Sequence, residues 1–279
     1  MNPDLRFDYT TVGHVTIDVL ADGARRAGGT AFYSALQAAR LGQRTLVITQ
    51  GVEREIEELI EPYMDELDIE IHLAPATTTL RTSGAGASRE QRVLAWAGRM
   101  PDDLRIDSAI LHLAPIAREG PAGWGGRTGF VGLTPQGMAR AWRAAGEEIF
   151  LAAPVEPAAT QLARTADALV LSEQERASCA AMIASAREAG ATVAVTAGAA
   201  PTRILLAGGG SLALEVAPVD DPGDDLGAGD VFAAAFFVAL SEGQTPERAA
   251  SFAAAAATVR MNGEGPNAIG DHAAIAARM

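Results

Sequence analysis

The sequence predicts an α/β protein with a largely parallel sheet that is covered by helices. Short apolar runs alternate with helical patterns along the 279 residues, and this alternation is typical of such sheets. Hydrophobic residues make up 48% of the chain and charged residues 20%, which suits a globular core and argues against disorder. No internal repeat or low-complexity linker divides the chain. We therefore expect one domain over residues 1–279, with a small β-rich insertion.

Short apolar runs bounded by Gly, Pro or polar residues predict the strands of the main sheet. In chain order they lie at 9–19, 45–49, 110–113, 129–133, 149–151, 168–171 and 192–196. Residues 203–207 and 211–216 are joined by the three glycines at 208–210, which predicts a hairpin.

Helical spacing of apolar residues predicts the helices between and after these strands. They are expected at 30–41, 53–68, 173–189, 227–240, 246–260 and 271–278. Thr30 is suited to cap the first of them, and Pro62 bends the second. Residues 69–100 contain few helix formers, so we predict that they form the β-rich insertion and project from the main sheet.

The charge and the residue types exclude several classes of function. The formal net charge of −13 disfavours nucleic acid and membrane surfaces as partners. The chain has no lysine, which excludes a P-loop and a Schiff base. Its one cysteine, Cys179, excludes intramolecular disulfides and fits a reducing compartment. Without an apolar leader or a membrane-spanning run, we expect a cytoplasmic protein.

The strongest motif is Asp224-Asp225-Leu226-Gly227-Ala228-Gly229-Asp230, which leads directly into an apolar helix. A turn of small residues at a helix start leaves backbone N–H groups free, and the helix dipole favours an anion there. Asp230 lies in the first helical turn, beside this anion site. The pattern suits phosphoryl transfer to a hydroxyl, with Asp230 as the base. Ordinary capping of an acidic helix start is the alternative reading of the same residues.

Two signatures make the sequence similar to the ribokinase-like (PfkB) carbohydrate kinase family. The C-terminal signature is Gly227 to Asp230 with its helix, and the N-terminal one is Gly28 to Ala35 followed by Ala38 to Gly42. Further matching positions are Gly13, Asp18, Ser172 to Glu175 and Val195 to Gly198. The resemblance spans essentially the whole chain in the expected order. It implies a three-layer αβα sandwich in which the insertion at 69–100 is a lid over the substrate.

The resemblance also implies a role for individual residues. Asp230 corresponds to the general base, and Gly227, Ala228 and Gly229 belong with it to the anion hole. The residues expected to bind substrate are Asp18, Gly28, Gly29 and Tyr33. Those expected to bind the nucleotide are Ser172, Thr196, Gly198 and Ala254. Glu175 corresponds to a residue that organises Mg²⁺, largely through water.

We therefore expect a kinase that uses ATP and Mg²⁺ to phosphorylate a sugar, a polyol such as inositol, or a nucleoside. Ser172 and Ala254 replace asparagines of the family, and Tyr33 replaces a substrate-binding asparagine, so a non-catalytic ligand-binding relative is the alternative. Asp224 and Asp225 are further candidates for holding a divalent ion, because two acids precede an anion site. The insertion is a candidate surface for a homodimer.

Overall fold

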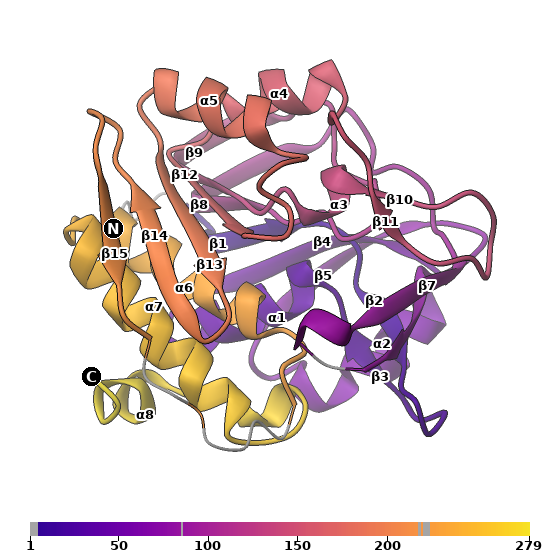
Figure 1. Cartoon of the computed structure of the whole chain (residues 1–279). Helices are drawn as coiled ribbons and strands as arrows, with labels where there is room; N and C mark the ends of the chain where they lie inside the picture. Colours follow the sequence, from indigo (N-terminus) through magenta and orange to yellow (C-terminus); the bar gives the residue numbers. More distant parts are fainter. Residues whose placement is uncertain (1–4, 85, 217–218, 220–223) are drawn as a thin grey trace.

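The computed structural model describes residues 5–84, 86–216, 219 and 224–279. A sheet of nine strands runs through the middle of the molecule, and its position can be followed in Figure 1. The strand order is β15-β14-β13-β12-β9-β8-β1-β4-β5. Neighbours from β13 to β5 are parallel, and β14 and β15 are antiparallel additions. The strands are β1 (Phe7–Val12), β4 (Thr45–Gly51), β5 (Asp68–Leu73), β8 (Arg105–Leu113), β9 (Gly125–Leu133), β12 (Ala168–Ser172), β13 (Thr192–Ala197), β14 (Ala200–Leu205) and β15 (Ser211–Leu214).

Helices cover both faces of this sheet, so the predicted three-layer sandwich is confirmed (Figure 1). One face carries α4 (Pro157–Ala163) and α5 (Ala180–Glu188), and the other carries α1 (Thr30–Arg40), α6 (Ala228–Ser241) and α7 (Pro246–Met261). Alternate residues of a strand point to opposite faces. On β12, Leu169 and Leu171 join the core beneath α4 and α5, while Ala168 and Val170 join the opposite core.

The remaining helical segments are short. They are α2 (Glu53–Ile60), α3 (Gln136–Ala139), α8 (His272–Ala276) and the 3₁₀ turns η1 (Glu61–Tyr63), η2 (Gly86–Ser88) and η3 (Pro266–Ala268). Among the residues described, no helix has the length and apolar character needed to cross a membrane.

A separate four-stranded sheet lies beside the large one, in the order β3-β2-β6-β7. Its strands are β2 (Thr16–Val19), β3 (Arg25–Gly28), β6 (Thr79–Ser83) and β7 (Glu90–Ala95). The extent predicted for the insertion, 69–100, is therefore wrong. Its first residues form β5, whose side chains are only partly buried at the edge of the large sheet and so carry no core pattern. Half of the small sheet comes from before residue 30.

Other expectations also need correction. The run at 9–19 divides between β1 of the large sheet and β2 of the small one. The run at 149–151 is not in the main sheet, because β11 (Phe150–Leu151) pairs with β10 (Arg140–Ala141) as a two-stranded ribbon. The helix expected from 173 begins only at Ala180, since the preceding residues form turns. Thr30 does not cap α1: the N-cap is Gly29, whose φ of 93° suits glycine.

Candidate active site

A cavity of about 750 Å³ opens at the carboxyl ends of the parallel strands. Segments that follow β8, β9, β12 and β13 contribute to its lining, and ligands bind at this edge in open α/β sheets. Ten of the residues expected from the sequence line it together: Asp18, Gly29, Tyr33, Ser172, Glu175, Thr196, Gly198, Gly227, Gly229 and Asp230. Gly28, Ala228 and Ala254 are not among the lining residues.

The anion-site turn, at the start of α6, leaves backbone amides without a protein acceptor among the described residues. Gly227 is the N-cap, with a left-handed φ of 81°, and a Cβ there would lie 2.2 Å from the Tyr33 ring. The Ala228 amide donates to the Asp225 carbonyl over 3.3 Å. The amides of Gly229 and Asp230 have no protein acceptor among the described residues, so they are the donors left for an anion.

Asp230 lies in this turn and has a buried carboxyl group with a raised pKa. Burial raises its pKa to about 7, although a hydrogen bond from Thr30 and the charge of Arg140 lower it. The neighbouring carboxylates Glu175 and Asp18 raise the pKa further. A pKa in this range is what a general base working at neutral pH needs. Ser34 donates to the Asp230 carbonyl over 3.0 Å and thereby ties α1 to α6.

Asp18 is the second carboxyl in the cavity. Burial raises its pKa to about 6, and the Thr16 hydroxyl donates to its Oδ1 over 2.7 Å. Its other oxygen lies so close to Gly28 that a Cβ at that position would be 2.1 Å away. Gly28 therefore leaves room for the carboxylate, which explains its place in the motif although it does not line the cavity. Tyr33 also lines the cavity, and its hydroxyl is buried.

The region expected to bind the donor follows β12 and β13. The Ser172 amide and hydroxyl both donate to Glu175 Oε2, over 2.8 and 2.9 Å. Ser172 thus holds the Glu175 side chain in place. Thr196 and Gly198 line the cavity, and Gly198 has a φ of 62°. Ala254 lies on α7 against the hydrophobic core.

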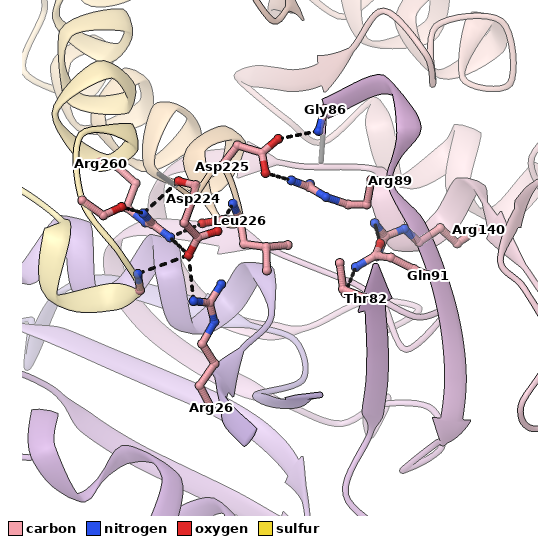
Figure 2. Close-up of polar contacts among 12 residues, drawn as sticks. Arg26, Thr82, Gly86, Arg89, Gln91, Arg140, Asp224, Asp225, Leu226 and Arg260 are labelled. Carbon is pink, nitrogen blue, oxygen red and sulfur yellow. Dashed lines mark hydrogen bonds and ion pairs between the residues drawn. The ribbon is translucent and has the colours of Figure 1, made fainter. Parts of the chain in front are cut away.

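Asp224 and Asp225 anchor the anion-site turn through arginines (Figure 2). Asp224 Oδ2 pairs with Arg26 over 2.7 Å and with the wholly buried Arg260 over 3.0 Å. Arg260 also donates to the carbonyls of Asp224 and Leu226. Asp225 accepts hydrogen bonds from Arg89 and from the amide of Gly86, both in the loop between β6 and β7. The two acids therefore have a structural role, and their acceptor oxygens already face cations or N–H groups.

Sequence reasoning missed three polar residues of the cavity: Gln91, Gln136 and Arg140. Gln136 and Arg140 follow the carboxyl end of β9, so a polar stretch directly after a buried strand was the available signal. Gln91 reaches the cavity from β7, and its own strand gave no such signal.

Fold and site together define a ribokinase-like kinase, and comparisons with known proteins agree. Residues 133–271 match the family described as pfkB family carbohydrate kinase. The chain belongs to this family of carbohydrate kinases. No curated protein matches it in sequence.

Solved structures show the same fold at low identity. One is a pyrophosphate-dependent myo-inositol kinase variant, with 20% identity, a TM-score of 0.75 and coverage of 96% of this chain and 98% of that one. Ribokinase of Arabidopsis thaliana, complexed with ribose and ATP, has 19% identity, a TM-score of 0.71 and 98% coverage of both chains. Nucleoside kinase of Methanocaldococcus jannaschii has 15% identity, a TM-score of 0.70 and 97% coverage of both.

Proposed function

We propose that this protein transfers the terminal phosphoryl group of ATP to a hydroxyl of a small polyhydroxylated compound. The observation that carries the proposal is the Asp230 carboxyl, which shares one cavity with Asp18 and with the free amides at the start of α6. Phosphoryl transfer to an alcohol needs a base at the hydroxyl and donors around the transferring group. These two requirements meet at Asp230.

In the proposed reaction, Asp18 binds hydroxyls of the acceptor and Asp230 accepts the proton of the reacting one. The hydroxyl oxygen bonds to the terminal phosphorus while the bond from that phosphorus to the bridging oxygen breaks. ADP leaves with the electron pair of the broken bond. The amides of Gly229 and Asp230 stabilise the charge on the phosphoryl oxygens during transfer.

Glu175 is the residue proposed to hold Mg²⁺. It is buried and lines the cavity, and only its Oε2 has hydrogen bonds among the described residues. Among the described residues, no group of three or more His, Cys, Asp or Glu side chains is arranged so that it could hold a metal ion by itself. This fits Mg²⁺, which keeps several waters and takes one or two carboxylates together with phosphate oxygens. The ion would neutralise charge on the donor phosphates.

The four-stranded sheet is proposed as a lid over the acceptor, since Asp18, Leu80 and Gln91 of its strands line the cavity. Sugars, polyols such as inositol and nucleosides all remain candidates for the acceptor, and solved relatives of this fold act on or bind each kind. Some of those relatives are pyrophosphate-dependent, so pyrophosphate is the second donor to test.

The test is a transfer assay with a panel of sugars, polyols and nucleosides, with Mg²⁺ and either ATP or pyrophosphate. We expect ADP release that depends on one class of acceptor and is lost in Asp230→Asn. Acceptor binding by thermal shift, without transfer from either donor, would instead support the non-catalytic relative.

A homodimer through the four-stranded sheet and a cytoplasmic location also belong to this proposal. Light scattering on the full chain gives the oligomeric state, and a monomer at micromolar concentration would remove the dimer. Neither property is needed for the chemistry.

A further inference from the structure

The cavity that would take a polyanionic donor is itself acidic. Its described lining contains two arginines, Arg89 and Arg140, and five carboxylates: Asp18, Glu173, Glu175, Asp225 and Asp230. Arg89 is already paired with Asp225. Since the chain has no lysine, the positive charge for a transferring phosphoryl group must come from the remaining cation or from a metal ion.

Arg140 is that remaining cation. The residue is only 9% exposed, and none of the ion pairs among the described residues includes it. Its guanidinium donates instead to two neutral acceptors, the Ile116 carbonyl over 3.1 Å and Gln91 Oε1 over 2.7 Å. A buried cation is costly unless opposite charge lies near it, and the carboxylates of Glu175, Asp230 and Glu119 act on Arg140 without forming an ion pair with it. Arg140 and Asp230 line the same cavity, and the charge of Arg140 lowers the pKa of Asp230.

We propose that Arg140 binds the oxygens of the transferring phosphoryl group, opposite the amides of Gly229 and Asp230. This inference rests on the proposed function and names a phosphoryl-binding residue for it. A planar guanidinium presents paired N–H donors that match phosphate oxygens. Bound there, Arg140 offsets the negative charge that Asp230, Asp18 and Glu175 place around the donor.

Gln91 links this arginine to the four-stranded sheet. Figure 2 shows it between Thr82 and Arg140, and its Nε2 donates to the Thr82 hydroxyl over 3.0 Å while its Oε1 accepts from Arg140. Both Gln91 and Thr82 belong to that sheet. Gln91 is therefore assigned as a positioning residue, because it accepts the hydrogen bond that orients the guanidinium of Arg140.

The first experiment measures binding by calorimetry with Mg²⁺ and three probes: the non-hydrolysable ATP analogue AMP-PNP, ADP and inorganic pyrophosphate. We expect Arg140→Gln to raise the dissociation constant at least tenfold for AMP-PNP, and for pyrophosphate if that is a donor. ADP lacks the transferring group, so its affinity should change less than threefold. Arg92→Gln is the control, because Arg92 is exposed on β7 and is not a lining residue.

The second experiment keeps the shape of the site. Gln91→Glu gives Arg140 a carboxylate partner at the same place, so it should weaken AMP-PNP binding at least fivefold while the melting temperature stays close to that of the wild type. In the double variant with Arg140→Gln, this effect should shrink, because the cation that the introduced carboxylate would pair with is gone. Effects that simply add would mean that the new charge acts on the ligand directly and would count against the positioning role.

Equal affinity of wild type and Arg140→Gln for AMP-PNP and pyrophosphate, in folded proteins, overturns the inference. An equal loss of affinity for AMP-PNP and ADP also overturns it, because a general structural role then explains the arginine. Wild-type protein that binds none of the three probes would count against the proposed function itself.

Discussion

At the scale of single residues, Asp230 and Asp18 are carboxyl groups whose pKa values burial raises to about 7 and about 6. Both pKa values lie above the usual aspartate value of 3.8, so these two carboxyl groups become neutral at a higher pH than an exposed aspartate does. A base must be deprotonated to act. Acidification therefore switches off Asp230 before most surface carboxylates are protonated.

For Asp230 we expect kcat/KM to rise with pH through about 7 and then to level off, since kcat/KM reports the free enzyme. Asp230→Asn should lower kcat by about 10² to 10⁴ and change acceptor affinity little. Initial rates from pH 5 to 9, together with calorimetric acceptor binding, check both statements. A variant as fast as the wild type would remove Asp230 from the mechanism.

For Asp18 we expect Asp18→Ala to weaken acceptor binding by about 1.5–3 kcal/mol for each charged hydrogen bond lost, with donor affinity unchanged. Gly28→Ala should also weaken acceptor binding, although the carboxylate is still present, because the added Cβ would lie 2.1 Å from Asp18 Oδ2 and displace it. Titrations of acceptor and donor separate the two effects. Damage to donor binding alone would show that the acceptor site is misplaced.

At the scale of elements, the loop between β6 and β7 is tied to the anion-site turn. Asp225 Oδ2 accepts from the Gly86 amide over 2.8 Å, and Oδ1 accepts from Arg89. A displacement of the four-stranded sheet away from this turn must break both contacts. Arg260 holds the same turn from its other side, because it donates to the Leu226 carbonyl and pairs with Asp224.

We expect Asp225→Ala to speed amide hydrogen exchange at residues 86–95 and to raise the acceptor KM several-fold, because the sheet loses its tie. Asp107→Ala, which removes an exposed ion pair with Arg127, is the control. The Mg²⁺ concentration for half-maximal rate should stay unchanged, since Asp225 is engaged with Arg89 and Gly86. A several-fold rise in that concentration would instead restore Asp225 as a metal-binding residue.

At the scale of the whole molecule, the large sheet contains a buried polar chain between β1, β8 and the end of β9. His112 Nδ1 is bonded to the Tyr9 hydroxyl over 2.9 Å and its Nε2 to the Thr134 hydroxyl over 3.0 Å. Burial lowers the pKa of His112 from 6.5 to about 3. The folded protein therefore holds this ring neutral where the unfolded chain would protonate it.

Its contribution to stability is present above pH 6.5 and is lost as pH falls towards 3, because the unfolded state binds the extra proton. We expect the free energy of unfolding to fall by about 1.4 kcal/mol per pH unit from this group. His112→Gln should flatten that slope, whereas His272→Gln, at an exposed position of α8, should not. Urea denaturation at several pH values measures the slopes, and equal slopes for all three proteins would contradict the assignment.

The layers of the fold could be predicted because each buried strand carries its own apolar run. The sequence does not predict where β5 and the Phe150–Leu151 strand lie, because their side chains are partly or largely exposed and pairing rather than composition decides their place. In the site, Gly227 to Asp230 could be predicted because the motif is contiguous. Gln91 and Arg140 come into contact only when β7 packs beside the segment that follows β9, and no local sequence pattern predicts that contact.

The cations around the anion-site turn are all guanidinium groups, because the chain has no lysine. Acetyl donors, glycating sugars and amine-directed labels therefore find no lysine target anywhere in this protein. Dicarbonyl reagents attack arginine, yet Arg260 is fully enclosed and the side chains of Arg26 and Arg89 are only 19% and 25% exposed. The positive charges of these arginines, which hold the anion-site turn, are thus protected from most reagents that modify basic residues.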